Sequence, residues 1–179
     1  MSPGFAEAVA SMVVSERTRV WIPKALALPA NVQPESAAKQ VDLTYDLVVL
    51  ALIAAPPTPK SLKAPAEGAR KLASGVALQR LQKGRDGARP DDSSRVRVHL
   101  SLWTNDGTLF ESTLMTGQPM VFSMAEIPVG LREGLRQMQL GERSRLWVPA
   151  ALAFGEKPLR RGQPAGNLVY EVELLELVP

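Results

Sequence analysis

The fold of this chain is indicated most clearly by one stretch, Gly130-Leu-Arg-Glu-Gly-Leu-Arg-Gln-Met-Gln-Leu-Gly-Glu-Arg-Ser-Arg-Leu-Trp-Val-Pro-Ala-Ala-Leu-Ala153. Its first part places Leu131, Leu135 and Met138 at positions i, i+4 and i+7, which form one apolar stripe of a short helix. After Gly141, arginines alternate with a serine and with apolar side chains, which is the period of a strand. The stretch therefore predicts a short helix followed by a strand with a solvated, arginine-bearing face.

The same stretch occurs a second time near the start, as Gly4-Phe-Ala-Glu-Ala-Val-Ala-Ser-Met-Val-Val-Ser-Glu-Arg-Thr-Arg-Val-Trp-Ile-Pro-Lys-Ala-Leu-Ala27. The two copies align without a gap at an offset of 126 residues. After a loop that is one residue longer in the first copy, Leu43–Leu50 matches Leu168–Leu175. Self-similarity at a fixed offset is the mark of a repeated structural unit.

The first copy is only a back half, because the strand-like sequence that precedes Gly130 has no counterpart ahead of Gly4. Two explanations stay open: a start codon inside a longer reading frame, which we favour, or a decayed remnant. We expect a partial domain at residues 1–53, a linker rich in Pro and Ala at residues 54–73, and a complete domain at residues 74–179. Proline removes backbone donors and fixes φ, so the linker is predicted to be an extended tether.

The complete copy reads as an antiparallel sheet with one helix. Gly75–Gly84 is a short strand candidate, and Val96–Trp103 alternates apolar and polar side chains as a half-buried strand does. Asn105–Thr108 supplies a turn, so a hairpin is predicted there. Leu168–Leu177 is the last strand. The sequence thus predicts an α+β fold.

Composition sets limits on function. The chain has 179 residues, 45% apolar and 22% charged, which fits a globular protein with one domain and part of another. A net charge of +3 is too thinly spread to indicate nucleic acid. The absence of cysteine excludes disulfides and thiolate chemistry. The apolar run Leu47–Ala55 is too short for a bilayer-spanning helix, and Met1–Glu7 lacks the features of a secretory signal, so a cytoplasmic protein without a membrane partner is expected.

A series of short strings carries a family resemblance by its order and spacing. The strings are Val98-His-Leu, Asp106-Gly-Thr-Leu-Phe-Glu-Ser, Gly117-Gln-Pro, Ile127-Pro-Val-Gly-Leu-Arg-Glu-Gly-Leu, Gly141-Glu-Arg, Val148-Pro-Ala-Ala-Leu-Ala-Phe-Gly and Leu168-Val-Tyr-Glu-Val-Glu-Leu-Leu. Together they resemble the FKBP-type peptidyl-prolyl cis-trans isomerases over nearly the whole of that domain. Residues 3–53 resemble its last third to half, and tandem forms are known in the family.

The resemblance implies an FKBP-like bent antiparallel sheet wrapped around a short helix, with an apolar pocket for a proline ring. The implied activity is rotation about Xaa-Pro bonds, a step in protein folding whose barrier is ~18–20 kcal/mol. It needs no cofactor and no metal, and its partners are proline-containing peptides or proteins. The sequence gives no indication of the oligomeric state.

The pocket of the family carries over onto residues of the second copy. The catalytic candidates are Phe110, Glu111, Phe154 and Tyr170, and the substrate-binding candidates are Leu100, Met120, Ile127, Pro128 and Leu131. A deletion of two residues just before Ile127 leaves the assignment of Ile127 and Pro128 open.

Several of these positions depart from the family pattern. Leu131 replaces a Trp at the pocket floor, Phe154 replaces a Tyr whose hydroxyl donates to the substrate carbonyl, and Leu100 replaces another Tyr. Glu111 replaces an Asp, and Thr116 replaces the Arg that anchors it, so Glu111 is expected to be a wall residue and not a base. Two functions stay open: a weak isomerase, or a non-catalytic binding or chaperone module. A third interpretation is that the pocket residues are ordinary core.

Overall fold

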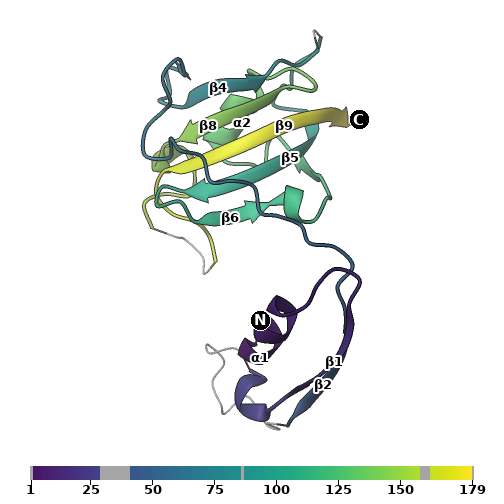
Figure 1. Ribbon diagram of the computed structural model, residues 1–179. Helices are drawn as coiled ribbons and strands as arrows, with labels where there is room; N and C mark the ends of the chain where they lie inside the picture. Colours follow the sequence, from purple (N-terminus) through teal and green to yellow (C-terminus); the bar gives the residue numbers. More distant parts are fainter. Residues whose placement is uncertain (1, 29–40, 86, 158–161, 179) are drawn as a thin grey trace. The chain divides into compact units, whose positions relative to one another are not determined.

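The computed structural model describes residues 2–28, 41–85, 87–157 and 162–178. The chain divides into a smaller unit, Met1–Ala54, and a larger unit, Ala55–Pro179, and each has its own antiparallel sheet (Figure 1). Within the described residues, no helix has both the length and the apolar character needed to cross a bilayer.

The sheet of the larger unit is built from antiparallel strands in the order β3-β4-β8-β9-β5-β6, and β7 also pairs with β5. The long central pair is β5 with β9, and the β5–β6 hairpin turns at Gly107, whose φ is 95°. The predicted hairpin and the α+β class are therefore confirmed. The strands are β3 (Arg70–Lys71), β4 (Ala77–Gln82), β5 (Arg95–Thr104), β6 (Leu109–Ser112), β7 (Met120–Ser123), β8 (Arg143–Val148) and β9 (Leu168–Val178).

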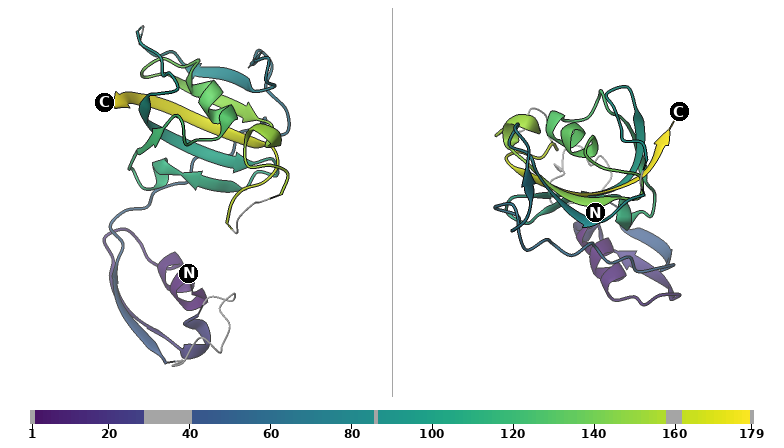
Figure 2. Two further views of the ribbon diagram at one scale, coloured as in Figure 1. Left: turned by 180° about the vertical axis from the view of Figure 1, so that it is seen from behind. Right: turned by 90° about the horizontal axis from the view of Figure 1, so that it is seen from above.

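The predicted helix is α2 (Val129–Leu135), and the sheet curves around it (Figure 2). Pro128 occupies the N-cap position, which suits proline because the first N–H groups of a helix have no intrahelical partner. Gly134 lets α2 approach β8 closely, since a Cβ at this position would collide with the side chain of Leu146. Two short 3-10 helices, η3 (Thr113–Met115) and η4 (Ala150–Leu152), complete the unit.

The main core lies between α2 and the concave face of the sheet. Its buried members come from β4, β5, β8 and β9, and from α2 and the residues that flank it. They are Leu78, Val96, Val98, Leu100, Leu102, Met124, Ile127, Leu131, Leu135, Met138, Leu146, Val148, Leu168, Tyr170, Val172 and Leu174.

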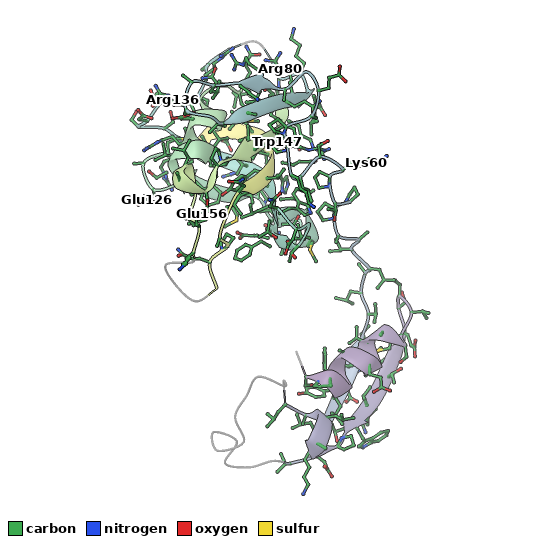
Figure 3. The ribbon with its side chains drawn as sticks, turned by 90° about the vertical axis from the view of Figure 1, so that its left-hand side faces the viewer. Lys60, Arg80, Glu126, Arg136, Trp147 and Glu156 are labelled. Carbon is green, nitrogen blue, oxygen red and sulfur yellow. The ribbon has the colours of Figure 1, made fainter. Side chains whose placement is uncertain are left out.

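A second, smaller cluster lies on the opposite face of the sheet. Ala77, Trp147 and Val169 form a row across β4, β8 and β9. Residues 61–69, which we call the strap, pack over this row through Leu62, Ala66 and Ala69, and the Trp147 indole donates a hydrogen bond to the Ser61 carbonyl. Figure 3 labels Trp147 and Lys60, the residue that precedes the strap. The structure thus differs from two expectations. Much of the expected tether is packed. Trp147, which alternates with Arg143 and Arg145 and so shares the strand face that was expected to be solvated, is covered by the strap.

Among its described residues, the smaller unit contains an α-helix, a 3-10 helix and a two-stranded sheet. Its elements are α1 (Pro3–Ala10), β1 (Arg17–Ile22), η1 (Lys24–Leu26) and β2 (Leu43–Val48). Phe5 on α1 meets Tyr45 on β2 edge to face, with ring centroids 5.3 Å apart. Met12 and Ile22 are buried, whereas Trp21 on the other face of β1 is 69% exposed. The predicted longer loop of the first copy lies mostly outside the described residues.

Candidate functional site

The residues expected to line the pocket come from five elements and from the turns beside α2 and η4. Leu100 lies on β5, Phe110 and Glu111 on β6, Met120 on β7, Ile127 and Pro128 just before α2, Leu131 on α2, Phe154 after η4, and Tyr170 on β9.

Four of these residues form a closed floor. Leu100, Ile127, Leu131 and Tyr170 belong to the main core and are each less than a tenth exposed, and Phe154 packs against them as a partly buried ring. The close approach of α2 to β8 places Leu131 over the sheet. The fold therefore brings together side chains that are far apart in the sequence, although little of their surface is open to a ligand.

The remaining residues are more exposed. Phe110 is 41% exposed, Glu111 is exposed, and Met120 and Pro128 are half-buried. None of these four is a member of the main core cluster. The pairing of β5 with β6 shifts register between Leu102 and Trp103, which leaves Phe110 as the extra residue of a bulge. Bulges re-aim side chains and are common beside active sites.

One row of side chains crosses the concave face from Glu111 to Leu146. Leu102 pairs with Glu111 on one side and with Tyr170 on the other, and Tyr170 pairs with Leu146. Directly paired residues of antiparallel strands point to the same face. The row therefore places a carboxylate near the ring of Tyr170.

Tyr170, a catalytic candidate from the sequence, carries a buried hydroxyl to which the family resemblance assigns no role. Tyr170 is 2% exposed, and its oxygen has no hydrogen-bond partner among the described residues. Burial raises the pKa of this phenol well above its usual range, and the negative charge of Glu111 raises it further. The group therefore stays protonated, as a hydrogen-bond donor in apolar surroundings. The sequence does indicate that this hydroxyl is buried, because the alternation in β9 puts Tyr170 on the same face as the apolar residues Leu168 and Val172.

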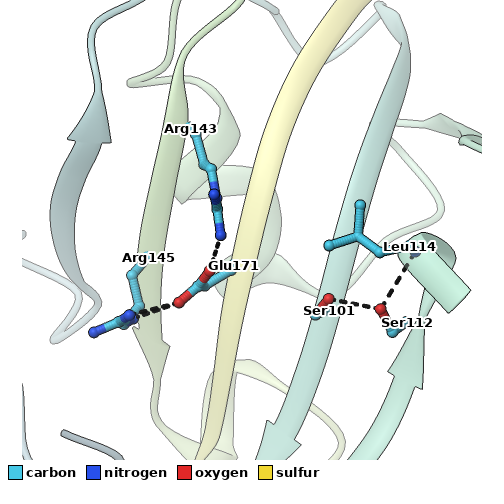
Figure 4. Close-up of polar contacts among 6 residues, drawn as sticks. All are labelled: Ser101, Ser112, Leu114, Arg143, Arg145 and Glu171. Atoms are coloured by element: carbon cyan, nitrogen blue, oxygen red, sulfur yellow. Dashed lines mark hydrogen bonds and ion pairs between the residues drawn. The ribbon is translucent and has the colours of Figure 1, made fainter. Parts of the chain in front are cut away.

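The opposite face of the sheet holds the arginines of β8 in ion pairs (Figure 4). Glu171 accepts from Arg143 at 2.7 Å and from Arg145 at Nε, 3.0 Å away. On the neighbouring strands, the Ser101 and Ser112 hydroxyls are 2.8 Å apart. These contacts tie β8 to β9 and β5 to β6 and engage both arginines within the sheet.

His99 is held by a structural contact, since its Nδ1 lies 3.0 Å from the Thr113 hydroxyl. Across the part of the chain that the structure describes, no three His, Asp or Glu side chains are grouped closely enough to hold a metal ion.

Comparisons with known proteins agree with this geometry. A family model described as "FKBP-type peptidyl-prolyl cis-trans isomerase" matches residues 87–175. The chain is 36% identical over 113 residues to the FKBP-type 22 kDa isomerase of Escherichia coli, covering 63% of this chain and 54% of that protein. It is 37% identical over 115 residues to FKBP2 of Mus musculus, covering 63% of this chain and 80% of that protein. The chain spans roughly half the length of the first relatives it matches.

Solved structures give the same fold. The crystal structure of FkpA from Escherichia coli matches with a TM-score of 0.59 at 30% identity, over 64% of this chain and 53% of that one. The N-terminal domain of FKBP42 from Arabidopsis thaliana matches with a TM-score of 0.58 at 27% identity, over 70% of this chain and 98% of that one. A curved sheet wrapped on a short helix, the matching residues 87–175 and the extent of the mouse match together show that this chain belongs to the FKBP-type peptidyl-prolyl cis-trans isomerase family.

Proposed function

We propose that the larger unit is a slow peptidyl-prolyl cis-trans isomerase that acts on proline-containing segments of proteins. An Xaa-Pro bond resists rotation because the planar amide is stabilised by resonance, with a barrier of ~18–20 kcal/mol. A dry pocket lowers this barrier when it fits the twisted form better than either planar form. Phe110, Phe154 and Met120 are the proposed entrance of that pocket, and Leu131 and Tyr170 are its floor.

The observation that carries this proposal is the buried hydroxyl of Tyr170, which has no hydrogen-bond partner among the described residues and lies beside the apolar floor. A buried hydroxyl without a partner costs about 1–3 kcal/mol, so such groups are retained where they serve a purpose. In our proposal it donates to the carbonyl oxygen of the bound substrate and replaces the hydroxyl that Phe154 lacks. Glu111, at the end of the same row, lines the side of the pocket and takes no part in proton transfer.

We expect the activity to be weak for two reasons. Leu131 and Leu100 are smaller than the aromatic residues that the family resemblance implies there, so less surface contacts the proline ring. The hydroxyl of Tyr170 is also covered in the free protein, and a substrate has to displace the side chains that cover it. Both effects raise the cost of binding.

The second candidate function is a non-catalytic module that binds proline-containing segments. The low exposure of Leu100, Leu131 and Tyr170, between 2% and 4%, favours this second function. Little of the floor is open, so the site is shallow and holds only the edge of a proline ring. The two functions differ in turnover and agree in the kind of ligand.

A protease-coupled assay separates the two functions. Peptides with Leu or Phe before the proline are mixed with the folded chain, and isomerisation is followed against buffer alone. An isomerase accelerates the slow phase in proportion to protein concentration. Rates equal to those in buffer, together with NMR shifts of Phe110 and Phe154 on peptide addition, would establish the binding module instead.

The organisation of the rest of the chain is also a proposal. Residues 1–53 are taken as the back half of a second FKBP-like domain, residues 54–73 as the connection, and residues 74–179 as the complete domain, with the strap as a packed part of the connection. The correspondence of β1 and η1 with β8 and η4 at the 126-residue offset, and of α1 with α2 to within one residue, supports this division. The cytoplasmic location stays a prediction, which cell fractionation tests.

A further inference from the structure

Residues 55–59, just before the strap, are constrained by their prolines. Pro56, Pro57 and Pro59 each fix φ at about −65°, and a residue that precedes a proline is pushed toward extended or polyproline II geometry. Each residue of this stretch is a proline or precedes one. The structure gives the stretch no helix, strand or turn. It therefore has the local chemistry of a polyproline II helix, which makes no internal hydrogen bonds.

Burial along this segment follows the three-residue period of such a helix. Pro56 is half-buried, Pro59 is buried and Leu62 is half-buried. The two residues between Pro56 and Pro59 are exposed, and so is Lys60. Three residues make one turn of a polyproline II helix, so Pro56, Pro59 and Leu62 share one side of it. The segment therefore lies with one side against the protein, as a bound proline-rich ligand does.

The surface beneath it is a row of side chains on the convex face of the sheet, opposite α2. Trp103 on β5 and Trp147 on β8 both pair directly with Val169 of β9. Paired residues of antiparallel strands point to the same face, so the two indoles flank Val169. Neighbouring strands are about 4.8 Å apart, which separates the backbones of the two tryptophans by about 9.6 Å. Three residues of a polyproline II helix span about 9 Å, so the row and the segment share one spacing.

Contacts place the segment across this row. A Cβ on Gly107, in the turn after β5, would lie 3.7 Å from the side chain of Thr58 and 3.5 Å from that of Leu62. Ser61, which is half-buried, accepts the hydrogen bond from the Trp147 indole. The segment thus passes from the end of β5 to β8. In Figure 1 this part of the chain crosses the sheet on the side away from α2, and Figure 2 shows the same side from above.

The segment does not use everything that this face offers. Trp103 is 0% exposed, and its indole N–H has no hydrogen-bond partner among the described residues. A cavity of about 130 Å³ is left beside Trp147, between Leu62 and Pro65 of the strap and Pro149 after β8. A buried donor without an acceptor and an unfilled cavity both weaken binding. The covalent link offsets this weakness, because it keeps the segment at an effective concentration in the millimolar range.

We propose that the convex face is a second binding site of this chain, which takes proline-rich segments in polyproline II form. Trp103 and Trp147 bind the repeating side of the segment. Asp106 and Lys60 line one open hollow beside it, so the site favours a cation after the second proline. The outside ligand is a protein segment of the pattern Pro-x-x-Pro-Lys-x-Leu, as in Pro56–Leu62.

The chain's own segment occupies this site until such a ligand displaces it. The site lies on the face of the sheet opposite the apolar floor described above, because the floor belongs to the core between the sheet and α2. The inference is therefore independent of isomerase activity.

The test uses the full chain and a fluorescein-labelled peptide with the sequence of residues 54–66. In one form of the chain, Pro59→Ala and Leu62→Ser weaken its own segment. Fluorescence anisotropy should show that this form binds the peptide at least tenfold more tightly than the unmodified chain, whose own segment competes. A peptide that itself carries Pro59→Ala and Leu62→Ser should lose at least tenfold in affinity. A peptide with Thr58→Ala and Lys63→Ser, at exposed positions, is the matched control and should bind within twofold of the original.

NMR locates the bound peptide. On an isotope-labelled chain, the indole N–H signals of Trp103 and Trp147 should shift when peptide is added, whereas that of Trp21 in the smaller unit should not. The signals are assigned by their loss in Trp103→Phe and Trp147→Phe. Trp147→Phe should also weaken peptide binding by roughly twofold to tenfold, because it removes one neutral hydrogen bond, and it should leave isomerase activity unchanged.

The proposal is overturned if the peptide does not bind the weakened chain while dispersed NMR signals show that this chain is folded. It is also overturned if the peptide shifts Phe110 and Phe154 and leaves both indole signals in place. Exchange of this segment between two unmodified chains, seen as a dimer in sedimentation, would make a second copy the occupant and would likewise overturn it. Should the weakened chain unfold, the unmodified chain is titrated with millimolar peptide, and unchanged signals of Trp103 and Trp147 would decide against the site.

Discussion

The indole nitrogen of Trp147 donates a hydrogen bond to the carbonyl oxygen of Ser61, 2.6 Å away and 86 positions earlier in the chain. This contact fixes the strap against the convex face of the sheet, where Leu62, Ala66 and Ala69 cover Ala77 and Val169. A segment whose prolines predict a tether is thus held, as far as the described residues show, by the hydrogen bond to Trp147 and by apolar contacts of Leu62, Ala66 and Ala69.

Removal of the strap is expected to destabilise the larger unit. A fragment of residues 74–179 lacks strand β3 and the strap that covers Trp147. Its free energy of unfolding should be about 2 kcal/mol lower than that of a fragment of residues 55–179. The difference comes from the lost half-burial of Leu62 and one lost hydrogen bond. Urea denaturation measures the difference. Leu62→Ser should reproduce part of it, and the exposed neighbour Lys63→Ser should not. Equal stability of the two fragments would show that residues 55–73 are a tether after all.

Phe110→Ala is expected to lower kcat/KM at least tenfold. A truncated ring no longer contacts the proline, and a buried apolar side chain is worth about 1.5–3 kcal/mol. Stability should change little, because Phe110 is 41% exposed in the free protein. Leu114→Ala is the matched control, since Leu114 is also 41% exposed and lies on η3. If both variants keep full activity, the pocket has been assigned to the wrong residues.

Tyr170→Phe separates a substrate contact from a packing role. Loss of one neutral hydrogen bond to the substrate should reduce kcat/KM by roughly twofold to tenfold, from about 0.5–1.5 kcal/mol. Stability should stay equal or rise, because the variant removes a buried oxygen that has no partner among the described residues. Coupled assays and urea denaturation measure the two effects. Tyr45→Phe, at the matching position of the smaller unit, is the control and should leave activity unchanged.

Phe154→Tyr tests the opposite change. A hydroxyl added to this partly buried ring should give the substrate carbonyl a second donor and raise kcat/KM by up to about tenfold. The same assay measures it. The gain should be larger in the Tyr170→Phe background, where no donor is left. A fall in activity in both backgrounds would mean that the Phe154 ring has to stay apolar to bind.

The raised pKa of Tyr170 predicts a loss of stability in alkali. Burial, and then the Glu111 carboxylate, keep the phenol protonated in the folded state, whereas it ionises near its usual pKa of about 10 when the chain unfolds. Above that pH the folded state binds more protons than the unfolded state, so the free energy of unfolding falls as pH rises. Urea denaturation between pH 9 and about 11 should show a steeper fall for the wild-type chain than for Tyr170→Phe. Parallel curves would contradict it.

The sequence by itself determined the helix α2, the strands β4, β5, β8 and β9, the β5–β6 hairpin and the class of the fold. The apolar stripe of Leu131 and Leu135, the alternation in β5 and β8 and the turn at Gly107 all depend on neighbours in the chain, so local patterns reveal them. The repeat likewise predicted that the helix and strand of the first copy, α1 and β1, would match α2 and β8, because similar local patterns form similar local structure.

Only the tertiary structure decided which of these residues are covered and by what. The strap over Trp147, the bulge at Phe110 and the unpartnered hydroxyl of Tyr170 each depend on strands or segments far apart in sequence. Trp21 and Trp147 share nearly the same local sequence, yet one is exposed and the other buried. Burial depends on what packs from elsewhere in the chain, and local periodicity carries no information about that.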